Sequence, residues 1–347
     1  MIITFTANPS IDATMSIDAL EAGGVLRVSE SRREAGGKGI NVSNAVLKAG
    51  HSTIAIAPVG DSDPFITLVA ADGIPLHSVP VPDPVRTNTT VTETDGRTTK
   101  FNESGARLNE TSVRGLEAEL VETARATGAR AAVLAGSLPP GAPADWYATL
   151  VRALREVGND LLIAVDTSDE PLKQLGRQLE GGAPDVVKPN AFELGQLAGL
   201  DGVELERQAD RGNLDTVVAA GRELVDKGIG EVLVTLGGAG ACLVTADGAW
   251  HASTPPAKVS STVGAGACLV TADRAWHAST PPAKVSSTVG AGDSSLAGYM
   301  LARLDGQDFP NALRNAVAYG TAAAAKPGTG IPSPDDIDLA RTTVREL

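Results

Sequence analysis

The sequence lacks any excess of basic residues. Its 347 residues include 29 lysines and arginines against 42 aspartates and glutamates, which gives a formal net charge of −13. Proteins that bind nucleic acid or an anionic membrane surface need basic surface to meet the phosphates. The charge balance therefore argues against both kinds of partner, and it means that local cations must attract any anionic substrate.

Long apolar runs are also missing. The sequence has no stretch of about 18 apolar residues and no charged segment followed by an apolar one, the pattern of a secretory signal. We therefore expect a cytoplasmic protein. The hydrophobic content of 42% and the charged content of 20% are those of an ordinary globular chain.

Cysteine is scarce, and both copies, Cys242 and Cys268, belong to a duplicated segment. Residues 238–263 recur as residues 264–289 with one substitution, Arg274 in place of a glycine. A disulfide between the copies would be unusual in the cytoplasm. Two nearly identical copies indicate a recent tandem duplication rather than a repeat fold. Without the duplication the chain has 347 − 26 = 321 residues, within the range of one α/β domain.

Short apolar strands alternate with helical patterns along most of the chain. Residues 2–6 and 232–236 are typical of buried strands, whereas residues 39–50 and 113–127 show helical periodicity. This alternation predicts a mostly parallel sheet with helices on its faces. Ligands bind such sheets at the carboxyl ends of the strands.

The motif Gly290-Ala291-Gly292-Asp293 leads into an apolar-periodic helix and is the main candidate for chemistry. Small residues at a helix start leave backbone N–H groups unpaired and directed at one point, where the helix dipole adds positive charge. The Asp293 carboxylate could take a proton from a hydroxyl that attacks a phosphoryl group held there. The structural alternative is a strand-to-helix turn with Asp293 as its N-cap.

A second glycine-rich loop, residues 36–39, also opens a helix and carries a cation, Lys38. Gly37 and Gly39 would let the backbone approach a ligand closely. The amide of Asn41, in the first turn of the helix, is suited to bind sugar hydroxyls.

A third polar group follows the apolar strand at residues 186–187 and contains Lys188, Asn190 and Glu193. One amide and one carboxylate, acting largely through water, suffice to place Mg²⁺ between phosphates. The same spacing also predicts a variant capping box at a helix start. Both interpretations can hold together.

The three motifs together resemble the PfkB family of ribokinase-like carbohydrate kinases, whose two signatures match residues 36–39 and residues 290–293. The resemblance runs from residue 2 to about residue 332. It implies a three-layer α/β/α sandwich with a mostly parallel central sheet and a small β-sheet lid. It also implies ATP and Mg²⁺ as cofactors, with Asp293 as the base and Gly290, Ala291 and Gly292 as the anion hole.

Residues 13–34 and 86–102 depart from the β–α alternation because they are rich in Thr, Val and Ser. We expect them to form the lid, which family members use to close over the substrate and often to contact a second subunit. The resemblance thus implies a homodimer through the lid. The main domain is expected to comprise residues 1–12, 35–85 and 103–347, with the duplicated segments 238–263 and 264–289 inside it.

The resemblance further implies which residues bind the substrate, a small sugar phosphate. Asp12 matches an aspartate that holds sugar hydroxyls, Lys38 and Arg86 match cations that reach the substrate phosphate, and Ser137 matches a serine that faces the substrate. The structural alternative for each is a solvated surface side chain or a plain turn residue. The expected substrate-binding residues are Asp12, Arg27, Gly37, Lys38, Gly39, Asn41, Arg86, Asn102 and Ser137.

The resemblance also implies that the nucleotide lies over the turn that follows the strand at residues 232–236. Thr235 and Gly237 match positions near the phosphates and ribose, and adenine is expected between this turn and the small-residue helix at residues 315–325. The expected nucleotide-binding residues are Lys188, Asn190, Glu193, Thr235, Gly237, Gly240 and Asn315, with Asn190 and Glu193 also holding Mg²⁺ largely through water.

The duplication falls inside this nucleotide edge. Its first Gly-Ala-Gly, at residues 264–266, is followed by Ala267, which cannot accept a proton, so only the second copy retains the base. One set of 26 residues must be extruded or must add strands to the sheet edge.

Within the family the motifs are most similar to those of 1-phosphofructokinases, which convert fructose 1-phosphate to fructose 1,6-bisphosphate. Tagatose-6-phosphate kinases and the minor type of 6-phosphofructokinase share the loops and differ in where the substrate phosphate lies. A different class remains open: a sugar-phosphate-binding paralogue whose catalysis is weakened by the duplication.

Overall fold

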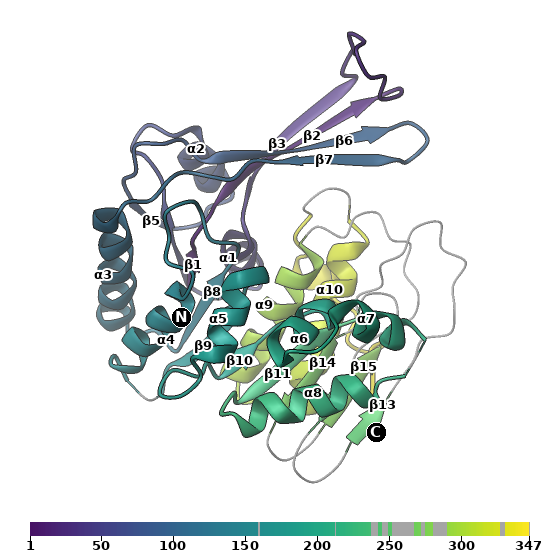
Figure 1. Ribbon diagram of the computed structural model, residues 1–347. Helices are drawn as coiled ribbons and strands as arrows, with labels where there is room; N and C mark the ends of the chain where they lie inside the picture. The colour runs from purple at the N-terminus through teal and green to yellow at the C-terminus, as the bar shows by residue number, and fades with distance from the viewer. Residues whose placement is uncertain are drawn as a thin grey trace.

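The computed structural model describes residues 1–158, 160–211, 213–236, 290–326 and 330–346, and between residues 236 and 290 it describes the backbone of four strands, 242–244, 249–251, 267–271 and 275–279. A central sheet runs through the molecule (Figure 1). Its strands, in spatial order, are β16 (Thr343–Glu346), β15 (Ala275–Ser279), β14 (Ala267–Thr271), β11 (Glu231–Thr235), β10 (Val186–Val187), β9 (Leu162–Asp166), β8 (Ala131–Ala135), β1 (Ile2–Thr6), β4 (Thr53–Pro58) and β5 (Leu76–Val79).

Among the described strands, the seven from β11 to β5 are parallel, whereas β14, β15 and β16 continue the sheet in antiparallel order. The parallel strands are nearly continuous apolar runs because both of their faces are covered. All five residues of β1 and of β8 are buried. The carboxyl ends of these strands therefore meet along one edge of a rigid, dry core.

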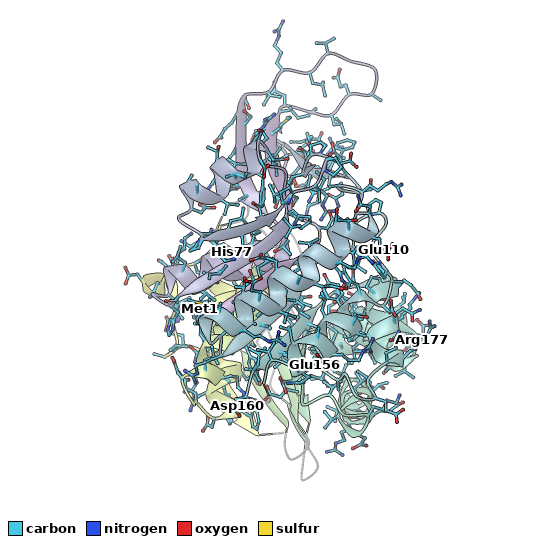
Figure 2. The ribbon with its side chains drawn as sticks, turned by 90° about the vertical axis from the view of Figure 1, so that its left-hand side faces the viewer. Met1, His77, Glu110, Glu156, Asp160 and Arg177 are labelled. Carbon is cyan, nitrogen blue, oxygen red and sulfur yellow. The ribbon has the colours of Figure 1, made fainter. Side chains whose placement is uncertain are left out.

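Helices cover both faces of the sheet, which confirms the predicted three-layer α/β/α architecture. One layer contains α1 (Lys38–Lys48), α9 (Ala291–Leu304) and α10 (Phe309–Ala324). The other layer contains α3 (Glu110–Thr127), α4 (Trp146–Arg155), α5 (Asp169–Arg177), α6 (Ala191–Ala198) and α8 (Asp215–Asp226). Two shorter helices, α2 (Pro64–Ala71) and α7 (Gly202–Asp210), lie beside these layers. Figure 2 looks onto the layer that contains α3, with Glu110 labelled at its start.

Aromatic side chains are few, and two of them pack in the core where the helix layer that contains α4 meets the sheet. Trp146 at the start of α4 is fully buried, and its ring meets that of Phe5 on β1 edge to face at a centroid distance of 5.2 Å. Edge-to-face pairs of this kind stabilise a core beyond the burial of their area. The contact fixes α4 against β1.

A second, small sheet stands away from the body, as Figure 1 shows at the top of the molecule. Its order is β3 (Glu30–Gly36), β2 (Ser10–Ile17), β6 (Arg86–Glu93) and β7 (Thr98–Asn102). Its first two strands extend past the expected range 13–34, to Ser10 at one end and Gly36 at the other, because their antiparallel ladder continues to the pair Ser10↔Gly36. We call these four strands the small sheet.

The second copy of the duplicated segment enters the central sheet. Strand β14 pairs with β11, and β15 pairs with β16, whereas β12 (Cys242–Val244) and β13 (Ala249–His251) of the first copy form a separate two-stranded sheet. Ala267, which follows the first Gly-Ala-Gly, begins a strand rather than a helix. None of the helices in the described ranges is both long and apolar enough to cross a membrane.

Candidate active site

Helix α9 begins at the Gly290 motif with its first amides free of helical hydrogen bonds. Gly290 is the N-cap and has a left-handed backbone, with φ of 80°, which favours glycine. The first helical bond runs from Ser294 N to Gly290 O, so the amides of Ala291, Gly292 and Asp293 precede the ladder. The alternative that Asp293 is the N-cap is wrong. Asp293 lies in the first turn of α9, and its carboxylate accepts a hydrogen bond from Asn41 of α1.

The carboxylate of Asp293 is buried and is held by α1. The residue is 7% exposed, and Asn41 donates from Nδ2 to Asp293 Oδ2 at 2.7 Å. Burial, aided by the negative charge of Asp166, raises the pKa of Asp293 to about 6, although Lys38, Asn41 and Lys188 act in the opposite direction. A carboxylate with this pKa is ionised at neutral pH and is a stronger base than an exposed aspartate.

Asp166 joins two lysines beside this carboxylate. Lys38 Nζ lies 2.7 Å from Asp166 Oδ1, and Lys188 Nζ lies 3.0 Å from Asp166 Oδ2. Although burial acts to raise it, the two ammonium groups hold the pKa of Asp166 below its usual range. Lys188 Nζ also lies at the entrance of α9, since a Cβ on Gly292 would come within 3.3 Å of it. Lys188 is therefore placed beside the free amides, and Asp166 joins it to Lys38.

Sequence reasoning missed Asp166. The signal was available, because Asp166 is the polar residue that ends the buried strand β9, and ligands bind parallel sheets at the carboxyl ends of their strands. What the sequence lacked was any indication that the end of β9 lies next to two lysines. Asp166 and Lys38 are 128 residues apart in the chain.

The glycines of residues 36–39 are required by packing. A Cβ on Gly39 would come within 2.4 Å of Thr6 Oγ1, and one on Gly36 within 2.4 Å of the Asp12 carboxylate. Gly37 has φ of 112°, which side chains rarely adopt. The loop therefore approaches the end of β1 and the carboxylate of Asp12 closely. It places Lys38 two residues along the chain from the glycine that contacts Asp12.

Asp12 lies on β2, opposite Asn88 in the ladder between β2 and β6. Ser10 Oγ donates to Asp12 Oδ1 at 2.8 Å, and Asn88 Nδ2 donates to the same oxygen at 3.3 Å. Burial raises the pKa of Asp12, against the effect of these hydrogen bonds and of Arg86. Asn88 was not predicted, and its buried Oδ1 has no partner within the part of the chain that the structure describes.

Arg86 and Ser137 line a surface cavity of about 560 Å³ together with Asn8. Asn8 Nδ2 lies 3.4 Å from Ser137 Oγ, and Arg86 donates from Nη2 to Asn8 O at 3.2 Å and from Nη1 to Glu103 O at 3.1 Å. This group brings a guanidinium, an amide and a hydroxyl to one wall. Asn8 was not among the predicted site residues.

The capping-box interpretation of Asn190 and Glu193 is confirmed. Asn190 is the N-cap of α6, its Oδ1 accepts from Glu193 N at 2.7 Å, and Glu193 Oε2 accepts from Asn190 N at 2.8 Å. Thr235 lies beside this turn, because its amide donates to Pro189 O at 2.9 Å. The box uses one oxygen of Glu193, so these residues also fit a metal bound through water.

Three further predicted residues lie in different parts of the fold. Arg27 is exposed on the loop between β2 and β3, and Asn102 is exposed opposite Asn88 at the end of β7. Asn315 lies beside Gly298, where its amide donates to Gln307 Oε1 at 3.0 Å and to Asn311 O at 2.9 Å. Gly237 and Gly240 lie outside the described residues.

Known proteins of one family match most of this chain. A family model described as pfkB family carbohydrate kinase matches residues 6–270 and 265–336, two ranges that overlap in the duplicated segment. The 1-phosphofructokinase of Rhodobacter capsulatus is 32% identical over 353 residues, which cover 100% of this chain and 98% of the relative. The ATP-dependent 6-phosphofructokinase isozyme 2 of Escherichia coli is 32% identical over 339 residues, covering 96% of each protein.

Solved structures extend the likeness to three dimensions. Phosphofructokinase-2 from Escherichia coli in complex with potassium superposes with a TM-score of 0.77 at 29% identity, and 96% of each chain is covered. The chain therefore belongs to the pfkB family of carbohydrate kinases, enzymes that transfer a phosphoryl group to a hydroxyl oxygen.

Proposed function

We propose that this protein is an ATP-dependent phosphosugar kinase that converts fructose 1-phosphate to fructose 1,6-bisphosphate. The observation that carries the proposal is the buried Asp293 carboxylate at the open entrance of α9, with two lysines beside it. In the proposed reaction the sugar hydroxyl oxygen bonds to the γ-phosphorus, the bond from that phosphorus to the bridging oxygen of ADP breaks, and the hydroxyl proton passes to Asp293.

Asn41 orients the base for this step. Its amide binds Asp293 Oδ2, which leaves Oδ1 to receive the proton. The amides of residues 290–292 are proposed to stabilise the charge that develops on the transferred group, and Lys188 adds a fixed positive charge at the same place. Removal of bulk water strengthens each of these interactions.

The capping box supplies the proposed metal site. Asn190 and Glu193 would hold Mg²⁺ largely through water, while Thr235 and the unplaced Gly237 and Gly240 would lie along the nucleotide. The bound ion would neutralise phosphate charge and orient the γ-phosphoryl group. Because the hydrogen bonds of the box already fix both side chains, little ordering remains to be done when the metal binds.

The sugar phosphate would bind between Asp12 and the cavity beside Arg86. Asp12 and Asn88 present oxygens for sugar hydroxyls, whereas Arg86 and Ser137 present donors for the substrate phosphate. We propose that the small sheet closes over this site as a lid. Fructose 6-phosphate and tagatose 6-phosphate are the alternative acceptors, since they differ from fructose 1-phosphate in where the phosphate lies.

The small sheet is also the proposed contact between two copies of the chain. The small sheet and the loop that joins β2 to β3 expose apolar side chains that water would otherwise surround: Phe101 on β7 is 55% exposed, and on the loop Leu20 is 43%, Val25 96% and Val28 47% exposed. Sedimentation of the protein at micromolar concentration should show a dimer, and a Val25→Asp, Val28→Asp variant should be a monomer. A wild-type monomer would contradict this contact.

The activity is tested by coupled ADP release with MgATP and a panel of fructose 1-phosphate, fructose 6-phosphate and tagatose 6-phosphate. Asp293→Ala should lower kcat by about 10²–10⁴-fold with little change in sugar-phosphate affinity, because the base acts only in the transition state. Asp305→Ala, an exposed aspartate at the other end of α9, is the matched control and should remain active. Binding without turnover in the wild type would instead favour the weakened paralogue.

A further inference from the structure

Asp166 is held more rigidly than a surface ion pair would be. Its backbone oxygen accepts from Gly136 N at 2.9 Å, and the hydroxyl of Thr167 donates to Gly136 O at 2.9 Å. The next strand is fixed to the same turn, because Lys188 N donates to Val165 O at 3.1 Å. The carboxylate thus has a defined place at the carboxyl edge of the sheet.

The two lysines on this carboxylate differ in their access to solvent. The side chain of Lys188 is 5% exposed and that of Asp166 is 1% exposed, whereas the side chain of Lys38 is 34% exposed. Lys38 is therefore the more accessible of the two cations. An anion that enters the site from solvent meets Lys38 first.

The two lysines and the two aspartates at the centre of the site carry equal and opposite charge in the absence of an anion. Lys38 on α1 and Lys188 after β10 supply two positive charges, and Asp166 at the end of β9 and Asp293 on α9 supply two negative ones. Glu193 on α6 adds a further negative charge that acts on Lys38. A phosphoryl group brings new negative charge into this balance and competes with Asp166 for the ammonium groups.

We propose that Asp166 is a positioning residue that holds Lys38 and Lys188 in the empty site, releases the Lys38 ammonium to an incoming phosphoryl group and recovers it when the product leaves. The proposal rests on the proposed kinase function. In the wild type, this competition weakens the binding of every phosphate-bearing ligand, including the product. Asp166 thereby lowers the affinity of the site for phosphate groups, keeps the lysines in place and favours release of the product.

The test is Asp166→Asn, which keeps the shape and removes the charge. Inorganic phosphate binding, measured by calorimetry at pH 8 without turnover, should tighten by about tenfold, because the site gains net positive charge. In the coupled assay KM for the sugar phosphate and kcat should both fall. The acid limb of kcat/KM should move to lower pH, because the negative charge of Asp166 no longer raises the pKa of Asp293. A residue with only a structural role would weaken phosphate binding and leave that limb in place, and either result would overturn the proposal.

Two further variants test whether the effect on phosphate affinity depends on the pair Asp166 and Lys38. Glu223→Gln removes one negative charge from the exposed Lys227–Glu223 ion pair at the end of α8 and should leave phosphate affinity unchanged. Adding Lys38→Met to Asp166→Asn should abolish the tightening, since the released cation is then absent. Should Asp166→Asn fail to fold, Lys38→Met alone should move the acid limb to higher pH, and an unchanged limb would overturn the proposal.

The phosphate measurement is independent of catalysis. If the wild type phosphorylates none of the sugar phosphates but Asp166→Asn still binds phosphate more tightly, the proposed function fails and the role of Asp166 stands. Active wild type with unchanged phosphate affinity in Asp166→Asn gives the opposite result.

Discussion

The Asp293 carboxylate is buried in the folded protein, and burial disfavours its negatively charged form. Its pKa of about 6 lies above the 3.8 of an ordinary aspartate, so the folded state binds more protons than the unfolded state between these values. The stabilisation that this provides is full below pH 4 and is lost as the pH rises through 6. At neutral pH the ionised base therefore destabilises the fold.

Asp293→Asn should consequently be inactive yet more stable than the wild type at pH 7.5. We expect the free energy of unfolding to rise by about 1–3 kcal/mol, because a neutral amide replaces a desolvated charge. Urea unfolding at pH 7.5 and pH 4 measures this, and the gain should vanish at pH 4. A variant less stable than the wild type at pH 7.5 would show that Asn41 and the lysines more than compensate the burial of the charge.

Glu193 allows capping and metal binding to be separated at a single residue. Glu193→Gln keeps an oxygen for the amide of Asn190 and removes the charge. The midpoint of thermal unfolding should change little, whereas the Mg²⁺ concentration needed for half-maximal activity should rise by about tenfold or more. Glu204→Gln, on α7 with its side chain 40% exposed, is the control and should leave the Mg²⁺ requirement as it is. An unchanged requirement in Glu193→Gln would mean that the residue only caps the helix.

Among the elements, the entrance of α1 depends on glycines that contact the end of β1. Gly39→Ala would place a Cβ 2.4 Å from Thr6 Oγ1 and 3.1 Å from Phe5 O, and the backbone oxygen cannot move aside easily. We expect a loss of about 2–4 kcal/mol in the free energy of unfolding and a larger loss of activity, because Lys38 and Asn41 move with the loop. Denaturant unfolding and the ADP-release assay test this together.

Gly158→Ala is the matched control for that prediction. A Cβ at this position meets nothing within 4 Å, and the change should alter stability by less than about 1 kcal/mol. Equal losses in the two variants would show that contact with β1 is not what requires the glycine at residue 39.

At the scale of the whole molecule, the duplication tests how much of the sheet edge is needed. The second copy supplies β14 and β15, which link β11 to β16 in the central sheet. The first copy supplies β12 and β13, which form a separate two-stranded sheet. Deletion of residues 238–263 should leave the fold intact and the kinase activity equal or higher. Hydrogen exchange of the β11 amides, residues 231–235, should remain slow, since their antiparallel partner is retained. Rapid exchange in the deletion variant would show that the first copy supports the sheet.

The local pattern of the sequence determined most of the elements. The pattern at residues 39–50 became α1, and that at residues 113–127 became most of α3. The capping box at Asn190 was predicted with its partner, because a cap depends on residues three apart. Chemistry at the Gly290 motif was predicted for the same reason, since the amides and the carboxylate of one helix turn are neighbours in the chain.

The tertiary structure alone decided the arrangement of charges and the fate of the duplication. Asp166 meets Lys38 across 128 residues, and Asn41 meets Asp293 across 252, distances over which no periodicity carries information. The two copies have nearly the same sequence and hence the same local preferences. Only pairing with β11 on one side and β16 on the other distinguishes them, because strand pairing satisfies backbone hydrogen bonds that local sequence cannot satisfy by itself.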